Sequence, residues 1–591
     1  MNSPFSLYYF KSRKIDLGEW EIPEQLDSVL YNPYDIAQLQ SYNPIYSLFF
    51  ELTETNFNKI SLNHVKHITD LNNVWNTQSK KEEENASFIK FSPLFDPIHT
   101  LIGKYDNEKI TNLGEMFHES ILAPKKTSKN MQKILNPFNA SYVDCFFNYL
   151  SSQLKNNHAF ENGIDFYGSY VGIQKHYKMN ITDDYEYLQD SEYFLENENK
   201  TYILNKKSDS SVPLPNMNSH KNKPKIFISE PIELSVKFDE LDIDGECEPD
   251  IDGECEPDID GECEPDIDGE CEPDIDGVCE PDIDGECESD GSESDGEMDL
   301  SLVYEKESSH NSSVSSSDNS NINESSDDDW SEMTHEKMEC EDETIYAYMK
   351  DFPIQLICIE QCDGTFDELL EKNMISDEET SSALMQVIMT LITYQKAFQF
   401  THNDLHTNNI MYKNTDKVWI EYTYCDKKYR VPTYGKIFKI IDFGRSIYRF
   451  QNKIICSDSF APGGDANTQY NAEPFYNNKK PRLEPNMSFD LCRLGCSMYD
   501  FIIDDSKTEK WSELQDTIMR WCTDDLNKNI LYKKNGEERY PNFKLYKMIA
   551  RIVHKHTPES QLEFPFFSRY LDLQIDSDKF LEINIDHIPK Y

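Results

Sequence analysis

Apolar residues recur at helical spacing in the segment Ser381–Phe400. The spaced positions are Leu384, Val387, Ile388, Leu391, Ile392 and Phe398. Positions three and four residues apart lie on one face of an α-helix, so this pattern predicts a long helix with a buried face. Gln386 and Gln395 interrupt the apolar run, and we therefore expect a helix of a protein core and not a membrane span.

Shorter apolar runs predict strands and a second helix. Ala86–Phe91 and Phe166–Ile173 have the composition of strands, and Ile354–Glu360 is a short apolar run suited to a buried strand. Ala140–Leu154 is expected to be helical. The pattern therefore indicates a mixed α+β protein with folded segments on both sides of its middle.

The middle of the chain has a different composition. Six cysteines recur at eight-residue intervals within an octapeptide repeat, IDGECEPD, which spans residues 242–288. Between Asp242 and Asp299 there are 28 acidic residues and no Lys or Arg, within a chain whose formal net charge is −52. So little apolar mass cannot offset the entropy that ordering would cost. We expect residues 207–343 to form one disordered, acidic and serine-rich insertion.

The repeat suggests two other interpretations, both involving metals. Its Asp-x-Asp-Gly resembles part of a calcium loop, but the further acceptor and the bidentate glutamate of such a loop do not recur at the required offsets. Cysteines eight residues apart do not form the close pairs of a structural zinc site. We therefore favour a solvated spacer. Its acidic charge also repels phosphate backbones, so we expect no nucleic-acid partner.

Three short motifs follow the predicted long helix. They are His402-Asn403-Asp404-Leu405-His406-Thr407-Asn408-Asn409, then Asp442-Phe443-Gly444, and finally Ser488-Phe489-Asp490-Leu491-Cys492-Arg493-Leu494-Gly495. Together they resemble the catalytic loop, the metal-binding Asp-Phe-Gly and the start of the central large-lobe helix of the protein kinase superfamily. The resemblance covers about Phe352–Asp500 firmly and the N-terminal part weakly.

The resemblance implies a fold and a set of roles. The fold would be bilobal and α+β, with a small β-rich N-lobe and a larger, mainly helical C-lobe. Asp404 would orient the acceptor hydroxyl and take its proton. Asn409 and Asp442 would hold Mg²⁺ against the phosphates of ATP, because oxygen ligands suit that ion. Phosphoryl transfer depends mainly on such positioning and charge neutralisation.

Three further residues would support this site. His402 would pack as a scaffold of the loop, Gly444 would permit the backbone geometry of the metal loop, and Asp490 would cap the catalytic-loop backbone. Taken singly, each carboxylate of these motifs could equally be a solvated loop acid or a helix cap. The argument rests on the three motifs occurring together and in order.

The resemblance extends less clearly to the N-terminal part. Ser87–Phe91 looks like the strand that carries the ATP-phosphate lysine of the family, which would make Lys90 that residue. Asp144 is the candidate for its carboxylate partner, one methylene shorter than the usual glutamate. Taken alone, Lys90 could be a surface lysine on a strand. Ile354–Glu360 with Gln361–Gly364 resembles the adenine-contacting strand and the hinge.

These assignments divide the chain into five parts. They are an N-terminal extension (1–55), the first part of the N-lobe (56–206), the insertion (207–343), the last N-lobe strand (344–360) and the C-lobe (361–591). A folded domain can tolerate such an insertion because loop-closure entropy grows only slowly with loop length.

The sequence departs from the kinase pattern in four places. No Gly-x-Gly-x-x-Gly motif precedes Lys90, so the phosphates would have to be covered in another way. Asn403 stands where the family has arginine, which removes the usual receptor for an activation-loop phosphate. His406 replaces the catalytic-loop lysine, and no clear Ala-Pro-Glu closes the activation segment.

Three functions are compatible with these features. A serine/threonine-protein kinase is favoured, because the intact Asp-Phe-Gly and the long segment before Asp490 look like a platform for a protein substrate. The chain most resembles the divergent serine/threonine kinases of giant DNA viruses of amoebae. The Asp-Leu-His sequence at Asp404 is also similar to that of aminoglycoside- and choline-kinase-like enzymes, which phosphorylate small molecules. The absent glycine motif favours a third function, a pseudokinase scaffold that presents the acidic tract to basic partners.

The N-terminal segment has no continuous apolar core of the kind that a signal peptide contains. We therefore expect an intracellular protein with reduced thiols, located in the cytoplasm, or in the host cytoplasm or virion if the protein is viral. The expected partners are ATP, Mg²⁺ and a protein substrate, with no membrane.

Overall fold

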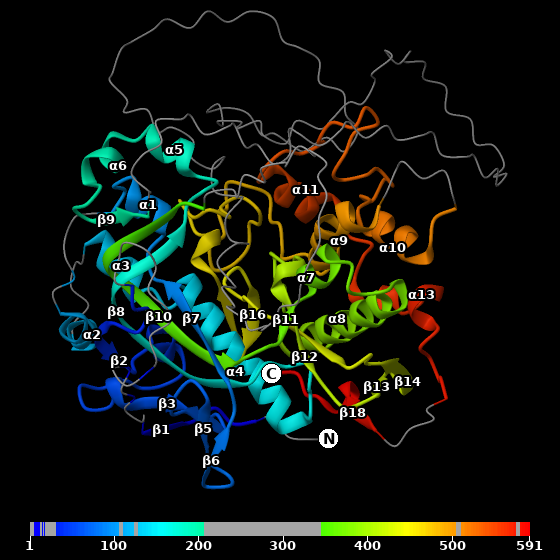
Figure 1. Ribbon diagram of the computed structural model, residues 1–591, viewed down its shortest axis with the longest axis horizontal. Coiled ribbons are helices and arrows are strands. Elements are labelled where there is room, and N and C mark those ends of the chain that lie inside the picture. Colours follow the sequence, from blue (N-terminus) through cyan, green and yellow to red (C-terminus); the bar gives the residue numbers. More distant parts are fainter. Residues whose placement is uncertain are drawn as a thin grey trace, which may run out of the picture. The chain divides into compact units, whose positions relative to one another are not determined.

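The computed structural model describes residues 5–11, 15, 17, 20, 31–105, 110, 112–122, 128–205, 344–503, 510–574 and 579–591. The predicted insertion at 207–343 lies outside these residues, and so do the interpretations of its repeat. The described residues form a mixed α+β structure with a strand-rich N-terminal region and a mainly helical C-terminal region (Figure 1).

The largest sheet belongs to the N-terminal region. Its strand order is β2-β8-β10-β7, and β9 also pairs with β10. The strands are β2 (Ile36–Gln40), β7 (Ser87–Pro93), β8 (Phe166–Asn180), β9 (Tyr202–Leu204) and β10 (Tyr346–Glu360). The three strand predictions are confirmed, although β8 and β10 are each 15 residues long and extend beyond them.

Strand β10 joins segments that are far apart in the sequence. It pairs antiparallel with β7, where Ile357 lies opposite Lys90, and it runs beside β8 (Figure 1). It also pairs with β9, where Tyr348 lies opposite Ile203. Since β9 precedes the segment 206–343 and β10 follows it, that segment interrupts one sheet and does not separate two domains.

Two small sheets precede β7 in the chain. The first pairs β1 (Tyr9–Lys11) with β3 (Ile60–Leu62), and the second is formed by β4 (Lys66–Ile68), β5 (Asn73–Asn76) and β6 (Lys81–Glu84). Among the strands that the structure describes, β7 pairs only with β10. The strand that carries Lys90 is therefore an edge strand of its sheet.

Six α-helices lie in the described part of the N-terminal region. They are α1 (Pro97–Leu101), α2 (Leu113–Leu122), α3 (Lys129–Leu135), α4 (Ala140–His158), α5 (Tyr185–Gln189) and α6 (Glu192–Asn197). Helix α4 begins at Ala140 as predicted, because the side chain of Asn139 accepts a hydrogen bond from the N–H of Ser141. It ends at His158, four residues later than predicted, where Ala159 adopts a left-handed conformation.

An aromatic cluster holds α4 against the C-terminal region. The ring of Phe147 on α4 lies 4.3 Å from that of Phe400, 4.5 Å from that of Phe443 and 5.0 Å from that of Tyr394, measured between centroids. Aromatic pairs at such distances each contribute about 0.5–1.5 kcal/mol beyond the burial of their area. Helix α4 is therefore fixed beside the Asp-Phe-Gly segment that contains Phe443.

The C-terminal region is mainly helical. Its helices are α7 (Phe366–Glu371), α8 (Asp377–Phe398), α9 (Phe489–Ile502), α10 (Glu513–Trp521), α11 (Lys544–Ile552), α12 (Pro558–Gln561) and α13 (Pro565–Ser568). The predicted long helix is α8. It begins earlier than predicted because Ser376 and Glu379 form a capping box, and it ends at Phe398, where Gln399 has a φ of 50°.

In its described residues, the C-terminal region also contains short strands, which form three small sheets. The three sheets are β11 (Gly364–Thr365) with β12 (Ile410–Asn414) and β15 (Lys436–Ile440), then β13 (Trp419–Tyr424) with β14 (Lys427–Pro432) and β18 (Phe580–Asn584), and finally β16 (Ile447–Phe450) with β17 (Lys453–Cys456). No helix in the described part of the chain is long and apolar enough to cross a bilayer. The eight cysteines in the same residue ranges all carry free thiols.

Candidate active site

Strand β7 places Lys90 between two carboxylates. The Nζ atom of Lys90 lies 2.8 Å from Oδ2 of Asp144, on α4, and 2.8 Å from Oδ1 of Asp442, which follows β15. Burial alone would lower the pKa of Lys90, but the carboxylates of Asp144 and Asp442 outweigh burial and raise it. Lys90 is therefore charged, and its predicted pairing with Asp144 is confirmed.

Asp144 also fixes the start of the Asp-Phe-Gly segment. Its side chain is completely buried, and its Oδ1 accepts hydrogen bonds from the N–H of Phe443 at 2.9 Å and from Nδ2 of Asn148 at 2.8 Å. The single carboxylate of Asp144 thus links β7, α4 and the segment after β15.

The unusual backbone geometry of this segment lies at Asp442. Its φ is 62°, a left-handed conformation that a residue other than glycine adopts only at a cost. Gly444 was expected to supply this geometry, and that expectation is wrong. The φ of Gly444 is not positive, and a Cβ there would lie 3.5 Å from Oδ1 of Asp442, an ordinary contact.

The catalytic-loop motif is held by the first turn of α9. The two carboxylate oxygens of Asp490 accept hydrogen bonds from the N–H groups of His402 and Asn403, each at 2.9 Å. His402 is fully buried, and its Nε2 lies 2.9 Å from the carbonyl oxygen of Ile441. The capping by Asp490 and the packed position of His402 are both confirmed.

Asn403 connects the loop to the segment that follows Asp-Phe-Gly. Its Oδ1 accepts a hydrogen bond of 2.8 Å from the hydroxyl of Tyr470, and its Nδ2 donates to the carbonyl oxygen of Arg445 at 3.0 Å. Asn403 is fully buried. Asn403 therefore has a structural role of its own.

Asp404 is covered by Tyr546. The hydroxyl of Tyr546, on α11, donates a hydrogen bond of 2.7 Å to Oδ1 of Asp404, and Nε of Arg493 donates to that hydroxyl at 2.9 Å. Only 4% of Asp404 is exposed. Burial alone would raise the pKa of its carboxyl, but the charges of Arg445 and Arg493 and the hydrogen bond from Tyr546 hold that pKa well below the usual range. Asp404 is therefore ionised.

His406 and Asn409 lie together in the same loop. Burial lowers the pKa of His406 to about 4, so its imidazole is neutral at pH 7. Nδ2 of Asn409 donates to the carbonyl oxygen of Asp404 at 2.9 Å and lies 3.0 Å from Nε2 of His406. The amide nitrogen of Asn409 thus contacts the protein, and its amide oxygen is the atom suited to a cation.

Strand pairing brings Asn409 and Asp442 to the same place. Asn409 directly precedes β12, Asp442 closely follows β15, and Ile410 lies opposite Ile440 in this antiparallel pair. In the described ranges, no three or more His, Cys, Asp or Glu side chains are placed to hold a metal. The side-chain oxygens of Asn409 and Asp442 are the donors that could hold a cation here, and such a set suits Mg²⁺ with phosphate.

Sequence reasoning missed the two tyrosines of this site, Tyr470 and Tyr546. Tyr546 lies 142 residues after Asp404 and belongs to no motif. The apolar pattern of α11 indicates a buried face, but it does not show which buried side chain reaches the carboxylate. No local signal could have identified either contact.

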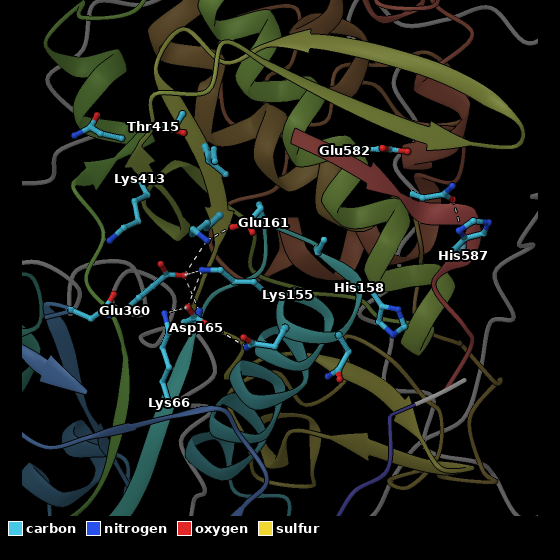
Figure 2. Close-up of a pocket in the computed structure, with 18 residues that line it drawn as sticks. Lys66, Lys155, His158, Glu161, Asp165, Glu360, Lys413, Thr415, Glu582 and His587 are labelled. Carbon is cyan, nitrogen blue, oxygen red and sulfur yellow. Dashed lines mark hydrogen bonds and ion pairs between the residues drawn. The ribbon is translucent and has the colours of Figure 1, made fainter. Parts of the chain in front are cut away.

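A separate polar cavity of about 890 Å³ lies where α4 and β10 end. Figure 2 shows Lys155 at its centre, with Nζ 3.1 Å from Oδ2 of Asp165 and 2.9 Å from Oε1 of Glu360. Nζ of Lys439 also lies 3.0 Å from Oε1 of Glu360. None of Lys90, Asp404, Asn409 and Asp442 lines this cavity.

Comparison with known proteins gives one local similarity. A stretch of 76 residues is 33% identical to the serine/threonine-protein kinase haspin of Bos taurus. The match covers 13% of this chain and 10% of haspin. No family model matches the chain. The similarity supports a relation of part of the chain to the protein kinase superfamily.

Proposed function

We propose that the chain is an ATP-dependent phosphotransferase with a bilobal protein kinase fold, which transfers the γ-phosphate of ATP to serine or threonine hydroxyls of proteins. The observation that carries this proposal is the position of Lys90 between Asp144 and Asp442. These three residues come from β7, α4 and the segment after β15, and phosphoryl transfer requires a cation and metal-binding oxygens held together in this way.

The nucleotide would bind at the accessible side of this cluster. The side chains of Lys90 and Asp442 are each 25% exposed, so both can be reached from solvent. Lys90 would contact phosphate oxygens, and Asn409 and Asp442 would hold Mg²⁺. When bound, the Mg²⁺ complex of ATP would supply the phosphoryl group with part of its charge neutralised.

The acceptor would bind at Asp404. Because Asp404 is ionised, it can orient an acceptor hydroxyl and accept its proton. The buried N–H groups of His402 and Asn403, bonded to Asp490, keep the loop that carries Asp404 in one conformation. Positioning of this kind accounts for much of the rate enhancement in phosphoryl transfer.

Two observations favour the pseudokinase alternative. Tyr546 covers Asp404, and β7 has no neighbour on its outer side among the described strands. The arrangement of Lys90, Asn409 and Asp442 weighs more heavily for catalysis. Transfer to small molecules and the resemblance to viral kinases both stay predictions.

The test is γ-phosphate transfer from Mg-ATP by the full chain to casein, histone and a panel of small alcohols and amines. Asp404→Asn is the control, since the amide keeps the shape of the buried side chain. Labelled protein that disappears in the variant would support the proposal, and label on small molecules alone would favour the second function. If ATP raises the melting temperature without any transfer, the chain is a nucleotide-binding pseudokinase.

A further inference from the structure

Two segments of the C-terminal region meet the catalytic loop through tyrosine hydroxyls. Tyr470 donates to Oδ1 of Asn403 at 2.8 Å, and Tyr546 donates to Oδ1 of Asp404 at 2.7 Å. Tyr470 directly precedes the loop 471–484, and Tyr546 belongs to α11. Both segments therefore contact the loop that carries Asp404, at two neighbouring residues.

The loop 471–484 has a defined shape. The backbone of Asn471 exchanges hydrogen bonds of 3.0 and 3.1 Å with Leu483 across its base. Nδ2 of Asn471 donates to the carbonyl oxygens of Asn477, Lys480 and Pro481 at 2.8–3.0 Å. One half-buried amide thus bridges three carbonyl groups near the tip of the loop.

The side chains at the tip of the loop are basic. Lys479, Lys480 and Arg482 are all exposed. Arg482 pairs with Glu484 and lies 5.2 Å from the ring centroid of Tyr476. Within the part of the chain that the structure describes, neither Lys479 nor Lys480 has an ion-pair partner. Its three basic residues outnumber its two acidic ones, Glu473 and Glu484, so the loop has a net charge of +1.

Helix α11 adds charge of the same sign. Its sequence, KLYKMIARI, contains two lysines and one arginine and no acidic residue. Lys547 directly follows Tyr546 and is partly exposed. This local excess of positive charge stands out because the formal net charge of the chain is −52. Clusters of one sign attract ligands of the opposite sign and increase their association rate.

We propose that the acceptor is an acidic polypeptide segment, whose aspartate and glutamate side chains pair with Lys479, Lys480 and Lys547 while its hydroxyl approaches Asp404. This inference rests on the proposed phosphotransferase function and specifies its substrate class. Exposed ion pairs are individually weak, so three of them together favour an acidic segment over a neutral one by about tenfold in kcat/KM. Because exposed charges are screened, the preference falls as salt is added.

The experiment compares three serine peptides, flanked by aspartates, by asparagines or by lysines. kcat/KM with Mg-ATP and peptide binding by fluorescence anisotropy are both measured at low and high salt. The variant is Lys479→Glu with Lys480→Glu. The matched control is Lys80→Glu with Lys81→Glu, two exposed lysines at the turn between β5 and β6. Thermal unfolding of both variants shows that they are folded.

The expected result is about tenfold higher kcat/KM and tighter binding for the aspartate peptide, lost in the loop variant and retained in the control. The inference would be overturned if kcat/KM and binding were equal for the aspartate and asparagine peptides. It would also be overturned if the loop variant kept the preference for the aspartate peptide. Selective binding of the aspartate peptide without any transfer would support the docking surface and contradict the proposed function. Phosphate transfer at equal rates to all three peptides would support the proposed function and contradict the docking surface.

Discussion

Oδ1 of Asp404 accepts a hydrogen bond of 2.7 Å from the hydroxyl of Tyr546. An acceptor hydroxyl that approaches this oxygen from the same side has to displace that of Tyr546. A hydrogen bond to a charged group contributes about 1.5–3 kcal/mol, so its loss on substrate binding weakens the binding of the acceptor. Tyr546 thus holds the loop in order while it opposes the acceptor.

The first prediction concerns Tyr546→Phe. Removing the hydroxyl takes away its hydrogen bond to Oδ1 of Asp404, and we expect the KM for the acceptor to fall about three- to tenfold while the KM for ATP is unchanged. Steady-state kinetics with both substrates measure the two values. Tyr532→Phe is the control, because its hydroxyl makes only a 3.4 Å contact with Asp500. A lower kcat with an unchanged acceptor KM would show instead that Tyr546 positions Asp404.

The second prediction concerns Lys90→Met. Without the ammonium group, the carboxylates of Asp144 and Asp442 face each other with no cation between them. We expect the free energy of unfolding to fall by about 1–3 kcal/mol, at the low end for a buried pair because Lys90 is partly exposed. We also expect Mg-ATP to lose most of its effect on the melting temperature.

Urea unfolding and thermal unfolding with and without Mg-ATP measure these effects. Lys59→Met is the control, since Lys59 is an exposed lysine of the same region. If the stability falls but Mg-ATP still raises the melting temperature fully, the ion pairs of Lys90 stabilise the fold. The same result would remove Lys90 from the nucleotide site.

Much of this fold follows from local pattern. The apolar spacing of α8, its capping box and the apolar run of β10 are properties of short segments, and each is recognisable without tertiary information. The short motifs identified Asp404, Asn409 and Asp442 as candidate site residues for the same reason. Lys90 could be paired with Asp144 only because the resemblance supplied a strand and a helix to place side by side.

The errors and omissions have a different origin. We expected Gly444 to adopt the unusual backbone conformation because glycine has no side chain to restrict it. Asp442 adopts it instead, with a φ of 62°, and tertiary contacts hold it there. The contact between Tyr546 and Asp404 spans 142 residues and depends on how α11 packs. Neither the strain nor the contact leaves a pattern in the residues nearby.

The third prediction concerns Asp490→Asn. Asp490 is fully buried, and its two oxygens accept from the N–H groups of His402 and Asn403. The amide oxygen of an asparagine would still accept a hydrogen bond from one of these N–H groups. Its NH₂ group would face the other N–H, which would then have no acceptor. We expect a loss of about 1–3 kcal/mol in the free energy of unfolding, with a lower kcat because the loop that carries Asp404 loosens.

Denaturant unfolding and steady-state kinetics of Asp490→Asn measure the two effects. Asp516→Asn, on the exposed face of α10, is the control and should change neither by more than a small amount. If kcat is unchanged although the stability falls, the caps stabilise the fold without affecting the position of Asp404.

The fourth prediction concerns the charges around the polar cavity. Burial alone would raise the pKa of Glu360, but Lys439 and Lys155 outweigh burial and hold that pKa well below its usual value. A carboxyl with a lowered pKa in the folded state stabilises the fold above its unfolded pKa of about 4.3, and this contribution is lost as the pH falls toward the folded value.

We therefore expect Glu360→Gln to lower the free energy of unfolding by about 3 kcal/mol at pH 7, because it leaves Lys439 and Lys155 buried without their shared carboxylate. The difference from the unchanged chain should shrink below about pH 4, where Glu360 itself becomes protonated in the unfolded state. Urea unfolding between pH 3.5 and pH 7 measures it. Glu368→Gln is the control, since the pair of Glu368 with Lys372 is exposed to solvent and contributes little to stability. A difference that stays constant with pH would mean that the packing of Glu360, and not its charge, stabilises the end of β10.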